Sequence, residues 1–314
     1  MKYFIKKLIT LIITLLFISM LTFAAFSVIP GDASLTKLGT DASPEQVEAL
    51  REQMGLNDPM PVRYVRWLKD ALRGDFGESY QYNGTAVSEL LAQRLPVTVV
   101  LSVMALIIIL ALSIPLGIIS AKHSGKWLDT FISQVTQITM AIPAFFLGIL
   151  LTYIFGLVLQ WFQPGKFVGL DESVSGCLKY LIYPAIAIAL PKIAMVVKFL
   201  RNSVLSEVKK DYVRTAYSKG NTKNGVLYKH VLKNALIPVI TFVALIIAEI
   251  LAGSIIVEQV FSVPGMGRLL ISSISNRDYP VVQAIVTYIT AIVVIINFIV
   301  DILYQLVDPR VNAQ

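Results

Sequence analysis

Charged residues, cysteine and histidine are all scarce in this sequence of 314 residues. Asp, Glu, Lys and Arg make up only 15% of it, whereas soluble domains carry about a quarter. Cys177 is the only cysteine, which excludes an intrachain disulfide and a cysteine-cluster metal site. His123 and His230 lie in different segments without HExxH or comparable spacing, so ordinary loop roles are favoured over metal ligation.

Apolar residues, by contrast, make up 56% of the chain, and the mean hydropathy is +0.71. They fall in long blocks rather than in amphipathic stripes, which is the pattern that a bilayer requires. The net charge of +7 does not indicate nucleic-acid binding, because Lys and Arg cluster between the apolar blocks. The composition predicts an all-α integral membrane protein.

Six apolar blocks are long enough to cross a membrane as helices. They cover residues 8–29, 95–121, 131–162, 178–200, 235–257 and 281–307. The first block spans about 33 Å at about 1.5 Å per residue, so a retained helix is favoured over a cleaved signal peptide. Pro115, Pro143 and Pro191 lie inside blocks and are expected to kink them.

The distribution of basic residues predicts that both termini lie in the cytosol. With six spans in this orientation, the inner segments contain 14 Lys and Arg, eight of them in residues 201–234. The two short outer loops contain only Lys166, Lys179, Arg268 and Arg277. Cytoplasmic loops of membrane proteins carry such an excess of positive charge.

A long outer segment, residues 30–94, separates the first two spans and is expected to fold as a small cap. Helical patterning is present at residues 43–54, with a plausible N-cap, and at residues 62–72. Glycine and asparagine at residues 74–77 and 83–84 predict turns. The segment is either a docking surface for a partner or a cover over the outer mouth, and the two roles are compatible.

The cytosolic segment 201–234 is highly basic and has helical patterning on both sides of Gly220. Val208, Tyr212, Val213 and Ala216 recur at spacings of four, one and three, which predicts a narrow apolar stripe on a charged helix. Such a ridge can insert into a groove on a soluble partner. A helix lying on anionic lipid is an equal alternative from the physics alone.

Residues 211–220 also resemble the cytoplasmic loop motif of binding-protein-dependent importer permeases. That motif is commonly written as Glu-Ala-Ala, three further residues and Gly. Arg214, Thr215, Ala216 and Gly220 occupy these places, so that Ala216 and Gly220 match literally. Pro238, the proline of the closing Leu-Pro element, lies eighteen residues after Gly220, further than in the general pattern. Both departures are usual in the peptide and nickel branch of the family.

Further matches occur in the order expected for the first, B-type, permease subunit of oligopeptide, dipeptide and nickel importers, and they cover nearly the whole chain. They lie at residues 29–32, 54–75, 95–98, 257–267, 276–280 and 301–310. The resemblance implies a five-helix permease core preceded by an N-terminal helix. The domains expected are an N-terminal helix (1–29), the outer segment (30–94), the core (95–307) and a cytosolic tail (308–314).

The resemblance also implies an assembly in the bacterial inner membrane. A second related permease subunit, two cytosolic ATPase subunits and an extracytoplasmic solute-binding protein are the expected partners. ATP and Mg would bind to the ATPases, and this chain would hold no cofactor and catalyse no reaction. A helix at 211–220 would couple it to an ATPase through Tyr212, Val213, Arg214, Thr215, Ala216 and Gly220.

The chain's own residues agree with a non-catalytic role. A phosphate-binding P-loop needs GxxxxGK[ST]. The run from Gly220 to Gly225 has both glycines but continues with Val226 and Leu227, so it lacks the lysine and the hydroxyl. No nucleophile, base and orienting acid are found in a credible catalytic arrangement.

Ionisable residues inside the spans need a structural or functional reason, because hydrocarbon disfavours charge. Glu249 is expected either to line the solute path, favouring cationic cargo, or to pair with Lys192 or another buried donor. Glu258 falls at the outer mouth, where contact with substrate and a simple helix-end position are both open. Lys198 and Asp301 are expected to be structural, lying near the inner ends of their spans.

The leading functional hypothesis is therefore an importer permease for di- or oligopeptides. The same machinery carrying nickel or another metal chelate is the close alternative. A stand-alone secondary transporter is disfavoured because it needs no large cytosolic segment and often shows symmetric halves. A membrane-embedded enzyme is disfavoured by the absence of paired catalytic groups in the spans.

Overall fold

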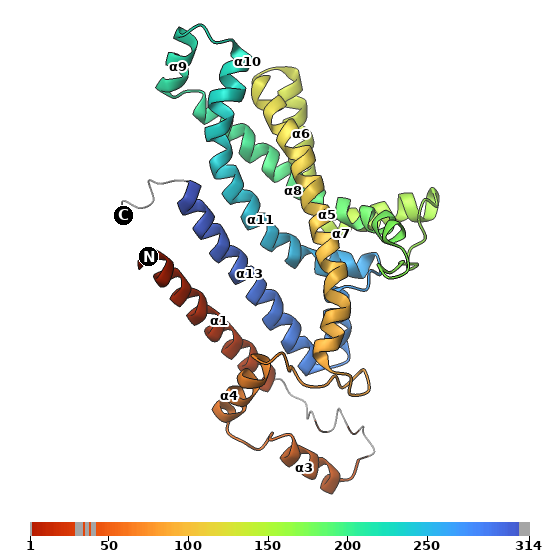
Figure 1. Cartoon of the computed structure of the whole chain (residues 1–314). Helices are drawn as coiled ribbons and strands as arrows, with labels where there is room; N and C mark the ends of the chain where they lie inside the picture. Colours follow the sequence, from red (N-terminus) through yellow and green to blue (C-terminus); the bar gives the residue numbers. More distant parts are fainter. Residues whose placement is uncertain (1, 29–33, 35–37, 39–41, 308–314) are drawn as a thin grey trace. The chain divides into compact units, whose positions relative to one another are not determined.

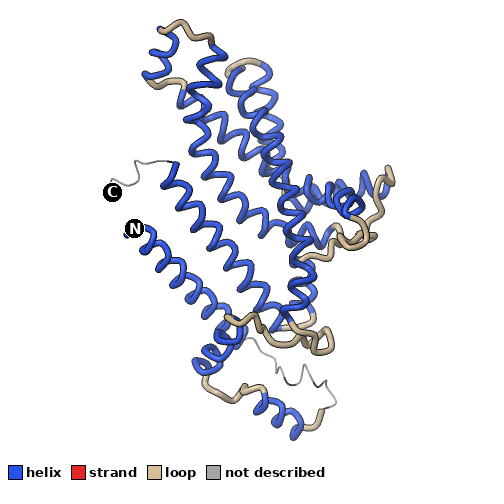
Figure 2. Tube along the Cα trace, in the orientation of Figure 1, coloured by secondary structure: helices blue, strands red, loops and turns tan. Residues whose placement is uncertain are grey.

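The structure is a computed structural model of the whole chain, in which residues 2–28, 34, 38 and 42–307 are described. Over these residues it is helical and contains no β-strand, apart from one isolated bridge between Glu78 and Ala86. Figures 1 and 2 show the long helices and the short connections between them. The prediction of an all-α fold is confirmed. The motif at 29–32, the tail at 308–314 and the side chain of Asp301 lie outside the described part.

The chain forms two compact units, which are described separately. One comprises Met1–Thr98 and Pro264–Ile295, and the other comprises Val99–Val263 and Ile296–Gln314. The first unit contains the N-terminal helix and the segment predicted to lie outside the membrane. The second contains the predicted cytosolic segment and most of the permease core.

Five helices are each long and apolar enough to cross a membrane, by length and composition. All five extend beyond the predicted apolar blocks at one end or both, because polar residues continue the helices past the hydrocarbon. They are α1 (Lys2–Val28), α5 (Val87–Lys122), α8 (Val174–Glu207), α11 (Leu232–Val260) and α13 (Tyr279–Val307). Pro184 and Pro191 lie inside α8 and Pro238 lies inside α11 without ending either helix.

The predicted span 131–162 is not one kinked helix. It consists of α6 (Trp127–Ala141) and α7 (Ala144–Leu151), which are bent by 96° from each other, and a π-helix, η1 (Thr152–Val158). Ile142 breaks the helix, with φ −92° and ψ 122°, because the ring of Pro143 disfavours helical backbone in the preceding residue. At this point the helical axis therefore turns through about a right angle, where only a kink was expected.

Contacts of Asp129 show that this bent pair makes one net crossing. Asp129, in the first turn of α6, accepts hydrogen bonds from Ser120 near the end of α5 and from Arg201 near the end of α8. The ends of α5 and α8 therefore lie together. Since α8 runs towards this shared end, it begins at the opposite one. The chain therefore travels from the shared end to the opposite end through α6, α7 and η1, which is one crossing. With the pair counted once, the described helices give the six crossings predicted.

In the first unit, α4 (Met60–Ala71) packs beside α1. The hydroxyl of Tyr64 lies 2.8 Å from that of Ser19, and the rings of Tyr64 and Trp67 lie 5.6 and 5.8 Å from Phe23. A second helix, α3 (Pro44–Gln53), begins with a capping box between Ser43 and Gln46. Both helices and the turns at 74–77 and 83–84 were predicted, and glycines 74, 77 and 84 have positive φ.

The turn after Gly77 is held by Asp278, just before α13. The carboxylate of Asp278 is fully buried and accepts hydrogen bonds from Ser79 Oγ at 2.5 Å and from the amide of Tyr80 at 3.1 Å. Another short helix, α12 (Met266–Ser275), was not predicted. Its first amide donates a hydrogen bond of 2.9 Å to the hydroxyl of Thr98. These contacts give a structural reason for the motifs at 95–98 and 276–280.

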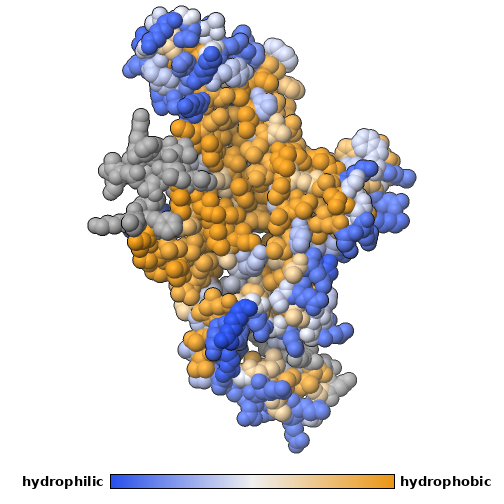
Figure 3. Space-filling view, in the orientation of Figure 1, coloured by the Kyte–Doolittle hydropathy of each residue, from blue (hydrophilic) through white to orange (hydrophobic). Residues whose placement is uncertain are grey.

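Figure 3 shows that apolar residues dominate the surface of the long helices, whereas hydrophilic residues gather where the predicted cytosolic and outer segments lie. On α1, Ile9, Ile13 and Phe17 are each at least half exposed. Such contiguous apolar exposure would be unfavourable in water and is what lipid requires.

Candidate functional site

The predicted cytosolic segment folds as three short helical pieces between two spans. They are α9 (Asp211–Ser218), α10 (Lys223–Val226) and the π-helix η2 (Leu227–Val231), which leads into α11. Gly220 follows α9 with φ +81°, a left-handed conformation that glycine adopts without strain. The predicted helix and its glycine end are confirmed, and Figure 1 shows α9 and α10 beyond the ends of α8 and α11.

Tyr212 connects α9 to the two neighbouring spans. Its hydroxyl donates a hydrogen bond of 2.8 Å to Oε1 of Glu207, at the end of α8. The same hydroxyl accepts one of 3.2 Å from Nδ2 of Asn234, at the start of α11. Burial is the largest cause of the raised pKa of Tyr212, so the phenol remains protonated and able to donate. Lys210 pairs with the other oxygen of Glu207 at 2.6 Å.

The apolar stripe on α9 faces this chain's own interior. Val213 is 1% exposed and Ala216 is 6% exposed, and α9 packs on α10 and η2. This differs from the predicted ridge that inserts into a partner's groove, because the two central residues of that ridge are already covered. The side chains left exposed on α9 are those of Asp211, Arg214, Thr215, Tyr217 and Ser218.

Glu249 and Lys192 form an ion pair between α11 and α8. Pairing with Lys192 was one of the two roles predicted for Glu249, the other being to line the solute path. The Lys192 side chain is 21% exposed and that of Glu249 is 51% exposed, so the carboxylate also faces the surface of the chain. The pair thus joins α8 and α11, while part of the Glu249 carboxylate remains exposed.

Glu258, predicted to lie at the outer mouth, is fully buried near the end of α11. Next to it, the carbonyl of Phe261 accepts a hydrogen bond of 2.5 Å from the hydroxyl of Tyr180. That hydroxyl also accepts a bond from the amide of Gly165. In this conformation Glu258 is enclosed by protein, so direct contact with a solute requires the region to open.

Sequence reasoning missed the ion pair between Asp129 and Arg201. Nε and Nη2 of Arg201 donate to the two carboxylate oxygens of Asp129 at 2.6 and 2.7 Å. The Asp129 side chain is 5% exposed, and the amide of Gly125 adds a further donor at 2.9 Å. A bidentate pair of this kind fixes geometry as well as charge. Arg201 had been counted only as one of eight basic residues in the cytosolic segment.

Among the described residues, no three His, Cys, Asp or Glu side chains lie together so that they could hold a metal ion.

A set of long apolar helices with a short helical segment fastened to two of them defines a polytopic membrane protein. Matches to known families identify the family of membrane proteins to which the chain belongs. Residues 113–313 match the family model "Binding-protein-dependent transport system inner membrane component", and residues 1–102 match the model of the N-terminal part of such components. The chain belongs to this family and is a multi-pass inner-membrane component of a transport system rather than an enzyme.

Relatives match this chain from end to end. The oligopeptide transport system permease protein AppB of Bacillus subtilis is 39% identical over 99% of both chains. The probable peptide ABC transporter permease protein y4tP of Sinorhizobium fredii and the dipeptide transport system permease protein DppB of Alkalihalophilus pseudofirmus are each 34% identical over 99% of both chains.

Among solved structures, a chain from the crystal structure of an amino acid ABC transporter with histidines shares the fold. The TM-score is 0.55 at 16% identity, and the match covers 69% of this chain and 94% of the other.

Proposed function

We propose that this chain is a permease subunit of an ATP-driven importer for di- or oligopeptides. The observation that carries the proposal is the similarity, over 99% of the chain, to permeases named for peptide, oligopeptide and dipeptide transport. These relatives favour peptides over nickel or another metal chelate as the cargo.

The proposed assembly contains a second, related permease subunit, two cytosolic ATPases that bind ATP and Mg, and an extracytoplasmic solute-binding protein. This chain forms half of the translocation path. ATP binding brings the ATPases together, and their movement tilts the spans between inward-open and outward-open states. Such coupling requires contacts that differ in free energy between the two states.

The proposed contact with an ATPase is α9. Arg214 and Thr215 lie on its exposed face, and Tyr212 fastens the helix to α8 and α11. Val213, Ala216 and Gly220 act by shaping the helix and its packing rather than by touching the partner. A displacement of α9 is therefore passed directly to two spans.

For the path, we retain Glu249 and Glu258 as candidates. The exposed face of the Glu249 carboxylate supports a role in attracting cationic groups, with Lys192 balancing its charge. Glu258 would contribute in an outward-open state. The outer segment 30–94 is the proposed docking surface for the solute-binding protein, and 95–307 is the proposed core.

The experiment that tests the function is ATP hydrolysis by the purified complex in lipid. Hydrolysis is measured with the binding protein alone, with the binding protein and di- or oligopeptides, and with the binding protein and nickel chelates. Stimulation by peptides supports the proposal. Stimulation by nickel chelates alone, or a permease that purifies without ATPase chains, would overturn it.

A further inference from the structure

A cavity of about 590 Å³ lies within the first unit, among the parts of the chain that surround the predicted outer end of α1. Its walls come from α1, α3, α4, the turn at 75–80 and the first residues of α13. Neither the ATPase contact nor the candidate path residues use this cavity, so its unusual lining needs a separate explanation.

One face of α4 supplies three of the charged side chains of the lining, and Arg51, Asp75 and Glu78 supply the others. The lining residues of this face are Arg63 and the residues three, four and seven positions after it, which are Arg66, Trp67 and Asp70. These spacings place all four on the same side of the helix. At about 1.5 Å per residue, Arg63 and Asp70 stand about 10.5 Å apart along the axis. The helix therefore presents the Arg63 guanidinium and the Asp70 carboxylate about two turns apart, with Arg66 between them.

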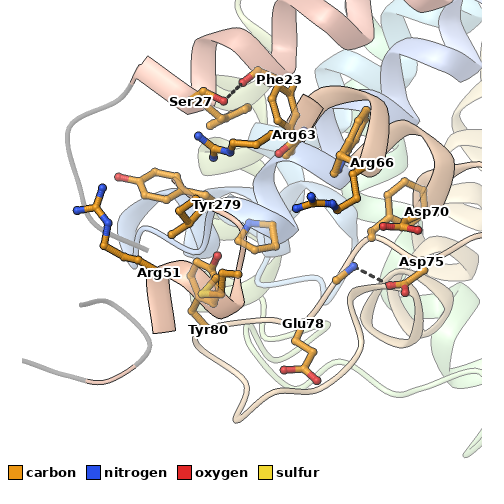
Figure 4. A pocket seen from close by; sticks show the side chains of 18 residues that line it. Phe23, Ser27, Arg51, Arg63, Arg66, Asp70, Asp75, Glu78, Tyr80 and Tyr279 are labelled. Atoms are coloured by element: carbon orange, nitrogen blue, oxygen red, sulfur yellow. Dashed lines mark hydrogen bonds between the residues drawn. The ribbon is translucent and has the colours of Figure 1, made fainter. Parts of the chain in front are cut away.

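Figure 4 shows this separation of charge in the pocket. The guanidinium groups of Arg51, Arg63 and Arg66 point away from the side on which Asp70 and Asp75 lie. Arg66 is held by Asp58 at 2.7 Å, outside the lining. Within the lining, the Arg63 guanidinium is thus separated from the carboxylates of Asp70 and Asp75.

Arg63 is the best-placed cation for an anionic ligand group. Its guanidinium lies 5.9 Å from the ring centroid of Phe23, a distance at which the ring stabilises the cation. Tyr80 also lines the cavity; burial raises the pKa of its phenol to about 12, Asp278 adds to the rise, and the charge of Arg63 acts against it. A carboxylate is the natural bidentate acceptor for such a group.

The opposite end of the cavity suits an ammonium group. The carboxylate of Asp75 is held in place by the amide of Gly77 at 2.9 Å, and Asp70 lies beside it in the lining. Trp67 and Phe76 add aromatic surface nearby. Carboxylates with aromatic faces form the usual surroundings of a bound ammonium.

We propose that this cavity binds a short peptide with free ends, with its carboxylate on Arg63 and its ammonium at Asp70 and Asp75. An extended chain covers about 3.3–3.6 Å per residue, so three residues match the rise of about 10.5 Å between Arg63 and Asp70 along the axis of α4. The inference rests on the proposed function for its ligand class. It adds a peptide site on the permease itself, distinct from the binding protein and from the candidate path residues.

The test measures equilibrium binding of radiolabelled trialanine to the purified membrane complex in nanodiscs, without the binding protein. We expect saturable binding that weakens at least tenfold when the peptide is N-acetylated or C-amidated. Arg63→Ala should remove the preference for a free carboxylate, and Asp70→Asn should reduce the preference for a free amine. Lys69→Ala, an exposed change on the same helix outside the lining, should bind like wild type.

Binding that is absent, that ignores both end modifications, or that survives Arg63→Ala and Asp70→Asn unchanged would overturn the inference. Competition by phosphatidylethanolamine in the nanodisc, without any effect of the peptide's ends, would assign the pocket to a lipid headgroup instead. Peptide-stimulated ATP hydrolysis in the presence of the binding protein is measured in parallel. If that stimulation persists while trialanine does not bind, only the pocket inference fails and the proposed function stands.

Discussion

The hydroxyl of Tyr212 donates a hydrogen bond of 2.8 Å to Glu207 and thereby ties α9 to the end of α8. Asn234 binds the same hydroxyl from the start of α11. One side chain thus connects the exposed cytosolic helix to two helices that cross the membrane. We therefore expect a displacement of α9 to reach both helices through the contacts of Tyr212.

Tyr212→Phe is expected to weaken coupling while leaving the complex assembled. The change removes a half-buried hydroxyl that makes two hydrogen bonds and should cost about 1 kcal/mol of stability. The measurement is the ratio of peptide-stimulated to basal ATP hydrolysis, which should fall several-fold with the ATPases still bound. Tyr217→Phe is the matched control, because Tyr217 is 43% exposed. An unchanged ratio in Tyr212→Phe would show that the hydroxyl does not transmit movement.

Asp129→Asn should destabilise the chain strongly. It removes the charge that compensates Arg201 at a carboxylate that is only 5% exposed, and breaking a buried pair costs about 3–5 kcal/mol. Thermal unfolding of the purified complex checks this. Asp58→Asn, which breaks the exposed pair with Arg66, should cost less than about 1 kcal/mol. Equal shifts for the two variants would contradict a special role for the Asp129 pair.

Glu249→Gln separates the two roles of that carboxylate. Gln keeps the shape and a hydrogen bond to Lys192 but removes the charge, so a path role predicts a several-fold loss in transport of cationic peptides relative to neutral ones. Lys192→Met, which breaks the same pair from the other side, should not produce that selective loss. Transport with an intact cargo preference in Glu249→Gln would leave only the structural role.

The raised pKa of Tyr80 should make the stability of the chain depend on pH in the alkaline range. Burial, with a further contribution from Asp278, raises the pKa of Tyr80 to about 12, whereas an unfolded chain titrates near 10. Between these values the unfolded state loses its proton first, so the free energy of unfolding falls as pH rises, by at most about 3 kcal/mol. Denaturant unfolding at two pH values should show a smaller fall in Tyr80→Phe. An equal fall in both proteins would contradict the assignment.

Much of the fold follows from local patterns. The long helices are predicted because uninterrupted apolar blocks need backbone hydrogen bonds inside the bilayer, and α3 and α9 because their ends carry the expected Ser43 and Gly220. The break between α6 and α7 was underestimated, although the Ile142–Pro143 step is a local signal. The residues around it are uniformly apolar, so composition does not reveal a change of direction.

The site was less predictable, because its contacts join distant parts of the chain. Periodicity finds the stripe of Val213 and Ala216 but does not tell whether this chain or a partner covers it. Asp129 and Arg201 are 72 residues apart, and no spacing rule connects them. The pair of Lys192 and Glu249 could be named in advance only because a charge inside a span needs a partner.

The central claim is that this chain couples peptide transport to ATPases through the exposed face of α9. The most direct measurement compares peptide-stimulated ATP hydrolysis in the complete complex for wild type and Arg214→Glu. Lys122→Glu serves as a matched charge reversal at the exposed end of α5. We predict that Arg214→Glu loses ATPase association or stimulation, whereas Lys122→Glu retains both. Full stimulation in Arg214→Glu, or no association of ATPases with the wild-type chain, would contradict the account.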